Sequence, residues 1–207
     1  LEMLNDTFLM DQCVIRNAIA CVSKHPELNQ VAINLSAQSF LDERLLPLIE
    51  SNLEKYNVPA SRIIFEITES ASINNLKATR KMIEKLNSLG CHFSIDDFGT
   101  GFSTFNYLKQ LPAQHVKIDG SFVSDMLNDP IDLALVKAIN DISRSLDKRS
   151  VAEYVENEEI FFALKEIGVD YGQGYFIARP IPVEKVKDEL EKISKNKTFY
   201  QQQASPK

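Results

Sequence analysis

The stretch LKATRKMIEKLNSLGCHFSIDDFGTG, residues 76–101, contains one complete transition from helix to strand. Its apolar residues recur at helical spacing from Leu76 to Leu89, and Gly90 follows as a helix stop signal. From Cys91 to Ile95 apolar and polar residues alternate, which is the period of a strand. The segment therefore predicts a helix that leads directly into a strand, as in an α/β fold.

The same succession of helix-like and strand-like segments continues along the chain. The predicted strands are Val31–Leu35, Arg62–Ile67, Cys91–Ile95, His115–Ile118, Ser150–Val155 and Val169–Tyr171. The predicted helices are Asp6–Ser23, Leu41–Tyr56, Leu76–Leu89, Ile131–Leu146, Glu158–Ile167 and Val183–Lys195. Because most strands are separated by a helix, the pattern predicts a parallel sheet built from βα units.

The number of strands limits the possible architectures. A closed (β/α)₈ barrel needs eight strands and typically about 250 residues, whereas this sequence has 207 residues and opens with a predicted helix. Either the sheet is open, or the front of a barrel is missing. No Pro- or Gly-rich linker divides the chain, so we predict one domain over 1–195, followed by a disordered tail over 196–207 that contains three consecutive Gln residues.

Composition excludes several classes of function. Lys and Arg total 23 against 29 Asp and Glu, and the net charge of −6 argues against a DNA- or RNA-binding protein. Three Cys residues with no paired short spacing exclude a disulfide scaffold and a zinc finger, and they fit a reducing compartment. The sequence has no membrane-length apolar run and no signal peptide pattern, so we expect a cytoplasmic protein.

Five consecutive predicted strands each carry a polar residue near the carboxyl end, on the face opposite their apolar residues. These residues are Asn34, Glu66, Asp96, Lys117 and Glu153. Strands of a parallel sheet are normally buried on both faces, so a solvated face does not readily explain this set. In a barrel, residues at these positions line the mouth where catalytic groups lie. The pattern therefore favours a functional site.

The residue types in this set indicate metal-dependent chemistry. Carboxylate and amide oxygens suit Mg²⁺ or Mn²⁺, and clustered carboxylates repel one another unless a cation is bound. The adjacent Asp96 and Asp97 can serve two ions, which at roughly 4 Å separation can hold a phosphodiester. Lys117 can orient the attacking water or offset phosphate charge. Gly99, Thr100 and Gly101 predict a tight loop just beyond the carboxylates.

A series of motifs across nearly the whole chain resembles one known family. The stretches are Ile33–Ser36, Phe65–Ser70, Ile95–Gly101, Leu111–Pro112, Val116–Val123, Ala152–Glu156 and Gly172–Tyr175, with Pro180 following. In this order and spacing they resemble the EAL family of cyclic di-GMP phosphodiesterases. The resemblance implies a TIM-like (β/α)₈ barrel of EAL type, here without its N-terminal strand or strands. It also implies hydrolysis of cyclic di-GMP to linear pGpG with two Mg²⁺ or Mn²⁺ ions.

The resemblance also assigns roles to individual residues. The implied metal ligands are Asn34, Glu66, Asp96, Asp97 and Glu153, and the implied catalytic residues are Lys117, Asp119 and Glu156. Gln173 is implied to line the substrate site, and Glu156 and Pro180 lie where the family contacts a guanine end. Glu69 resembles the residue that anchors the loop containing Gly99, Thr100 and Gly101. The implied partners are cyclic di-GMP, a second copy in a homodimer, and an upstream sensory or GGDEF-type domain.

Two departures from the family pattern affect the expected activity. The signature Glu-Ala-Leu segment, whose Glu is a metal ligand, is absent, and Tyr154 stands where the family usually has Gly. We therefore expect this chain alone to be weak or inactive, and its unpaired strand edges to favour association. The alternatives are a degenerate domain that acts as a cyclic di-GMP sensor or protein-interaction module, and a hydrolase of another phosphodiester.

Overall fold

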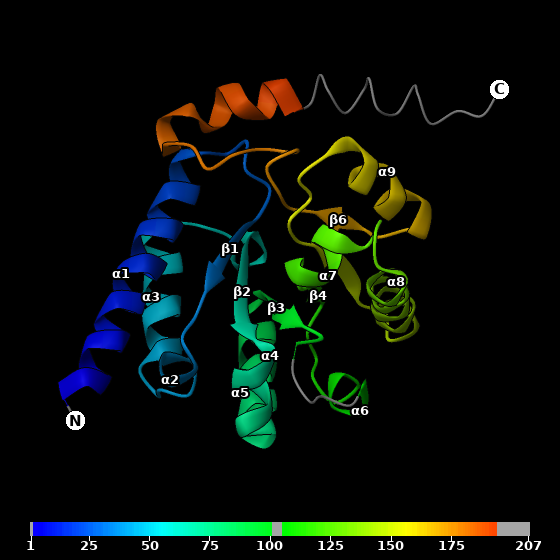
Figure 1. Ribbon diagram of the computed structural model, residues 1–207. Coiled ribbons are helices and arrows are strands. Elements are labelled where there is room, and N and C mark those ends of the chain that lie inside the picture. Colours follow the sequence, from blue (N-terminus) through cyan, green and yellow to red (C-terminus); the bar gives the residue numbers. More distant parts are fainter. Residues whose placement is uncertain (1, 101–104, 194–207) are drawn as a thin grey trace.

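The computed structural model describes residues 2–100 and 105–193, and its centre is one parallel sheet (Figure 1). The strands are β1 (Val31–Asn34), β2 (Ile63–Thr68), β3 (His92–Phe98), β4 (His115–Ile118), β5 (Arg149–Ala152) and β6 (Tyr171–Gly172). They follow one another in the order β1-β2-β3-β4-β5-β6, and every neighbouring pair is parallel. All carboxyl ends therefore lie at the same end of the sheet.

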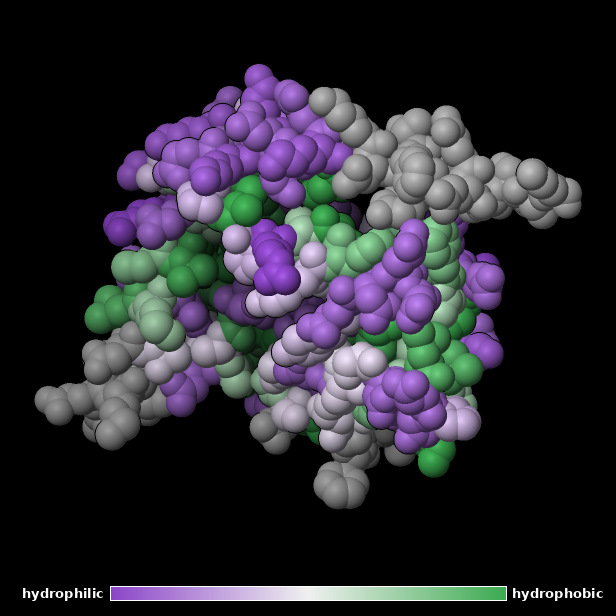
Figure 2. Space-filling model, turned by 45° about the horizontal axis from the view of Figure 1, so that its top comes forward, coloured by the Kyte–Doolittle hydropathy of each residue, from purple (hydrophilic) through white to green (hydrophobic). Residues whose placement is uncertain are grey.

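Helices follow the strands and cover the sheet. They are α1 (Glu2–Lys24), α2 (Ala37–Phe40), α3 (Leu45–Tyr56), η1 (Ala60–Arg62), α4 (Glu69–Asn74), α5 (Leu76–Leu89), α6 (Phe105–Leu108), α7 (Gly120–Asp125), α8 (Pro130–Ser145), α9 (Glu158–Ile167) and η2 (Val183–Lys185). A further helix covers 186–193, and hydrophilic side chains dominate the surface over it (Figure 2). Of the helices in the described part of the chain, none combines the length and the apolar character that a membrane span requires.

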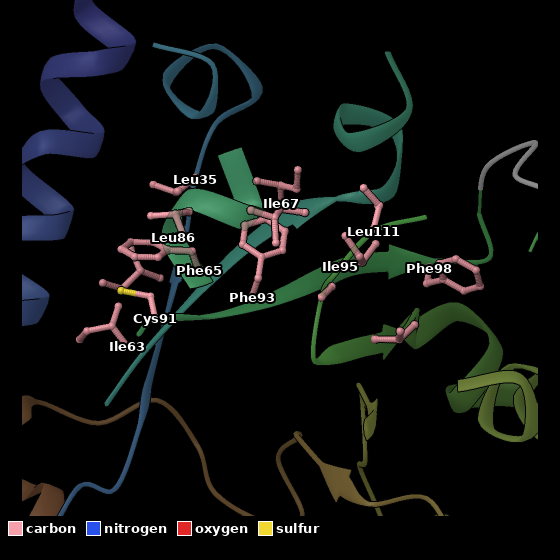
Figure 3. Packing of buried hydrophobic residues seen from close by; sticks show 14 of the residues in the cluster. Leu35, Ile63, Phe65, Ile67, Leu86, Cys91, Phe93, Ile95, Phe98 and Leu111 are labelled. Carbon is pink, nitrogen blue, oxygen red and sulfur yellow. The ribbon is translucent and has the colours of Figure 1, made fainter. Parts of the chain in front are cut away.

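The apolar faces of the strands form the core with the helices. Phe65 and Phe93 are in register on β2 and β3, both are fully buried, and both belong to the same hydrophobic cluster as Leu86 of α5 (Figure 3). The ring of Phe40 packs on that of Phe93, with 5.3 Å between their centroids. Full burial of each such side chain stabilises a fold by about 1.5–3 kcal/mol. The core thus uses one face of each strand and leaves the other for polar groups.

Two predicted helices match the structure at both ends because their signals are local. Asn75 Oδ1 accepts a hydrogen bond from Ala78 N (3.3 Å) at the start of α5, and Asn157 Oδ1 accepts one from Ile160 N (2.9 Å) at the start of α9. Gly90 and Gly168 end these helices in the left-handed conformation. Side-chain caps and terminal glycines fix helix ends without help from the rest of the fold.

Other predicted boundaries are wrong. The helix expected over Leu41–Tyr56 begins only at Leu45, because Asp42 Oδ1 accepts hydrogen bonds from Arg44 N and Nε and forms a turn before it. The strand expected over Ser150–Val155 ends at Ala152. The short helices α2, α4, α6 and α7 were not predicted, since four to six residues are too few to establish a helical period. The predicted tail, 196–207, lies outside the described residues.

Candidate active site

Lys117 joins three of the polar residues that the sequence singled out. It lies on β4 with only 5% of its side chain exposed, and its Nζ is 3.2 Å from Glu66 Oε2, 2.8 Å from Asp96 Oδ1 and 2.9 Å from Glu153 Oε1. These carboxylates come from β2, from β3 and from the residue directly after β5. Four adjacent strands therefore bring their polar residues together, as alternation predicts.

Burial and mutual repulsion perturb the charges of this cluster. Burial raises the pKa of Glu66, and the charges of Asp96 and Glu153 raise it further. The pKa of Glu153 is raised by burial and by the charges of Asp96 and Asp97. Burial alone would lower the pKa of the Lys117 ammonium, but the surrounding carboxylates raise it above its ordinary value. The lysine is therefore a fixed positive charge within an excess of negative charge.

Asp97 joins the cluster through an irregularity of β3. The register between β3 and β4 shifts between Ile95 and Phe98, and Asp97 has a φ of 52° in the left-handed region. Strict alternation would send Asp96 and Asp97 to opposite faces, whereas a bulge re-aims one of two neighbouring side chains. As a result, carboxylate oxygens of Asp96, Asp97 and Glu153 lie within 4.8 Å of one another.

This carboxylate group fits a hard divalent cation. Its donors are all oxygens, the type that Mg²⁺ and Mn²⁺ bind. The pKa of Asp97 is raised by burial and by the charges of Asp96 and Asp119, so a bound cation would relieve existing repulsion. Asn34 is exposed at the end of β1 and is in register with Glu66 on β2, at the same end of the sheet.

A cavity of about 570 Å³ opens beside this carboxylate group. It is lined by Asp97, Asp119, Glu153, Tyr154, Glu156, Gln173, Gly174, Tyr175, Ala178, Arg179 and Pro180. Backbone hydrogen bonds from Gln173 N to Ala152 O (2.8 Å) and from Val155 N to Gln173 O (3.0 Å) hold two of its walls together. The cavity therefore combines residues that the sequence associated with metal, catalysis and substrate, namely Asp97, Asp119, Glu153, Glu156, Gln173 and Pro180.

Two short helices fix the loops around the cluster. Glu69 begins α4 and is buried, and its Oε2 accepts a hydrogen bond from Gly99 N (2.9 Å). Thr100 Oγ1 donates to the backbone carbonyl of Asp97 (3.0 Å), while Gly101 lies outside the described residues. Asp119 caps α7 by accepting from Ser121 N (2.9 Å) and from Ser121 Oγ. The loop after β3 and the carboxylate of Asp119 are thus held in place by hydrogen bonds that involve backbone atoms.

Comparisons with known proteins agree with this geometry. A family model described as the EAL domain matches residues 1–180. The chain belongs to the EAL-domain family. Within residues 2–100 and 105–193, six strands form an open parallel sheet, which confirms the predicted EAL-type barrel with fewer than eight strands.

Several relatives of this EAL domain are named for their activity. It is 39% identical over 185 residues to the cyclic di-GMP phosphodiesterase PdeB of Shewanella oneidensis, covering 88% of the chain but 22% of that protein. It is 40% identical over 165 residues to the cyclic di-GMP phosphodiesterase PdeF of Escherichia coli, covering 80% of the chain and again 22% of the relative. The chain thus spans about a fifth of the length of these curated relatives.

Solved EAL structures have the same fold. The PaMucR phosphodiesterase in complex with c-di-GMP superposes with a TM-score of 0.84 at 33% identity, covering 89% of this chain and 76% of that one. The EAL domain of Mycobacterium smegmatis DcpA gives 0.84 at 29% identity, covering 89% and 85%. Both are structural relatives across most of the described strands and helices.

Two residues of this EAL domain's cavity were not recognised as candidates from sequence. Tyr175 and Arg179 both line it, and the Arg179 guanidinium lies over the Tyr175 ring at 4.6 Å from the centroid. Among the described residues that line this cavity, Arg179 has the one cationic side chain. Tyr175 and Arg179 lie in a segment without a regular hydrophobic period. Only the excess of acidic residues in the site could have indicated that a cationic side chain such as Arg179 would line it.

Proposed function

We propose that this EAL domain hydrolyses cyclic di-GMP to linear pGpG with two divalent cations. The observation that carries the proposal is the carboxylate group Asp96, Asp97 and Glu153, which borders a cavity of about 570 Å³. Such a cavity is large enough for a small-molecule ligand. The activity named for PdeB and PdeF supports the same substrate.

Five residues are proposed as cation ligands: Asn34, Glu66, Asp96, Asp97 and Glu153. Bound Mg²⁺ or Mn²⁺ supplies a water of lowered pKa and neutralises charge that develops on the phosphate. Lys117 is held as a cation by its three carboxylate partners, so we assign it to orienting the attacking water and offsetting phosphate charge. A lysine with a raised pKa is unsuited to act as a general base.

The remaining candidates are proposed to act around the substrate. Asp119 borders the cavity beside Asp97 and is assigned to the catalytic group with Lys117 and Glu156. Gln173 and Pro180 are assigned to substrate binding, Glu156 and Pro180 to a guanine end. Glu69, Gly99, Thr100 and Gly101 are proposed to set the loop that carries Asp97, since Glu69 accepts from Gly99 N.

A turnover assay with defined products tests this function. The chain is incubated with cyclic di-GMP and Mg²⁺ or Mn²⁺, and the products are separated and identified by mass. Because the Glu-Ala-Leu ligand is absent from this chain, we expect pGpG to form slowly and only when a divalent cation is present, and bis(p-nitrophenyl) phosphate to be a poorer substrate. Absence of pGpG beside an active reference phosphodiesterase would exclude the function for this chain.

The second candidate is a cyclic di-GMP sensor without turnover. The observation that favours it is Lys117 itself, whose ammonium already compensates Glu66, Asp96 and Glu153 without an ion. Nucleotide binding measured by calorimetry in EDTA separates the two. Tight binding in EDTA with no pGpG in Mn²⁺ supports the sensor, whereas metal-dependent pGpG supports the enzyme.

A further inference from the structure

We propose that Tyr154 is a substrate-positioning residue whose ring forms a stacking wall for a purine base. The inference deepens the proposed function and rests on it. Tyr154 directly follows Glu153 and lines the same cavity, so whatever occupies that cavity beside the carboxylates meets its ring. Tyr154 need not bind a cation for this role.

The backbone at Tyr154 is held in an unfavourable conformation. Its φ is 51°, in the left-handed region where residues other than glycine are strained. Strain of this kind persists only where the surrounding structure imposes it, and it concentrates at functional sites. In this conformation the ring lies against Gly120, the first residue of α7.

Gly120 lies directly beneath this ring. A Cβ atom built at Gly120 would lie 1.3 Å from Tyr154 Cδ2 and 2.2 Å from Cε2, so no other residue type fits beneath the ring. Gly120 itself is buried, whereas Tyr154 remains 59% exposed. The ring is therefore fixed on one side by backbone and open on the other, which is the arrangement of a rigid stacking platform.

The surroundings of the ring define the class of ligand. The cavity around the ring is lined by the acidic side chains Asp97, Asp119, Glu153 and Glu156, and by Gln173 and Arg179. An exposed aromatic face in a polar cavity favours a planar aromatic ligand, and every nucleobase can stack on one. A purine nucleotide can place its base on Tyr154 while its phosphodiester lies toward the carboxylates.

Substitutions at both partners of the contact test the proposal. Tyr154→Leu removes the π face, Gly120→Ala displaces the ring, and Tyr154→Phe retains it. We expect Tyr154→Leu and Gly120→Ala each to raise KM for cyclic di-GMP about tenfold, in line with the strength of base–aromatic stacking, and Tyr154→Phe to restore a low KM. The exposed Tyr171 lies outside the residues that line the cavity, so Tyr171→Leu is the matched control.

Tyr154→Gly separates a binding role from a structural one. Glycine tolerates the left-handed conformation, so we expect this variant to melt at or above the wild-type temperature while its KM for cyclic di-GMP rises. A KM equal to or below the wild-type value in Tyr154→Leu or Tyr154→Gly would overturn the proposal. If the wild-type protein neither binds nor hydrolyses cyclic di-GMP, the proposed function itself is wrong, and the proposed role of Tyr154 is wrong with it.

Discussion

Lys117 is the residue on which the charge balance of the site depends. One buried ammonium contacts Glu66, Asp96 and Glu153, and Asp97 adds a further negative charge nearby. Charges removed from water are tolerated only when partners compensate them, and removal of one partner leaves the others buried and unpaired. The same cluster therefore contributes to stability without metal and is poised to bind a cation.

We expect Lys117→Met to destabilise the metal-free protein by about 3–5 kcal/mol, the range measured when one partner of a buried ion pair is removed. Mn²⁺ should then raise the melting temperature more in this variant than in the wild type, because the cation replaces the missing charge. Urea unfolding and thermal melts with and without Mn²⁺ measure both effects. The exposed Lys137 supplies the control Lys137→Met, and equal stability of the two variants would contradict the expectation.

Alternation along the strands predicted most of the site but not all of its geometry. Alternation placed Glu66, Asp96 and Lys117 on one face, and they meet there. Asp97 and Tyr154 could not be placed in this way, because both have a φ near 50° that no periodic pattern reveals. Their orientation depends on a bulge and on the space above Gly120, which are tertiary features.

A partly buried polar network joins β5 to the segment before β6. Asp170 accepts hydrogen bonds from Arg149 Nη1 (2.7 Å) and from Ser150 N (3.0 Å), while Ser150 Oγ donates to Asn140 Oδ1 of α8 (2.7 Å). Partial burial acts to raise the pKa of Asp170, but the hydrogen bonds from Ser150 and Arg149 and the charge of Arg149 lower it overall. The carboxylate form therefore stabilises the folded state.

This network predicts a dependence of stability on pH. Because the folded pKa of Asp170 lies below its unfolded value of about 3.9, its contribution is present above pH 4 and is lost as the pH falls through the folded pKa. We expect Asp170→Asn to lower the free energy of unfolding at pH 6 and to differ less from the wild type near pH 3. Urea titrations at both values measure this, with the exposed Asp141→Asn as control. A constant difference between wild type and Asp170→Asn would contradict the assignment.

The boundaries of elements were predictable where the local chemistry was sufficient. Asn and Gly residues delimit α5 and α9, and both helices match their predicted ends. The short α4 and α7 follow directly from Thr68 and Asp119, which cap them at the ends of β2 and β4. In the sequence, each of these short helices is marked by a single capping residue. That residue predicts a helix start only when the end of the preceding strand is already known.

The strands of the sheet lie side by side in the order of the sequence, as predicted for successive βα units. Among the described strands, β1 pairs with β2 alone and β6 pairs with β5 alone. An edge strand presents unpaired N–H and C=O groups that can pair with another chain. The homodimer and the upstream sensory or GGDEF-type domain remain predictions, as does the cytoplasmic location.

We expect the chain to self-associate through the β1 edge at micromolar concentration. Light scattering should give a mean mass above the 23.4 kDa of one chain, and Ala32→Lys should lower it by placing a charge on the exposed edge residue. Ala134→Lys, on the exposed surface of α8, is the control. A monomer at every concentration, or equal association by Ala32→Lys, would contradict this expectation.

The carboxylates at the ends of β3 and β5 are proposed to hold divalent cations for hydrolysis of cyclic di-GMP. This role is tested by the rate of pGpG formation as Mn²⁺ is added to the wild type, to Asp96→Asn and to the control Asp141→Asn. We expect the rate to rise with Mn²⁺ in the wild type and the control, and to fall at least a hundredfold in Asp96→Asn without loss of fold. Formation of pGpG by Asp96→Asn at the wild-type rate, or by the wild type in EDTA, would contradict the claim.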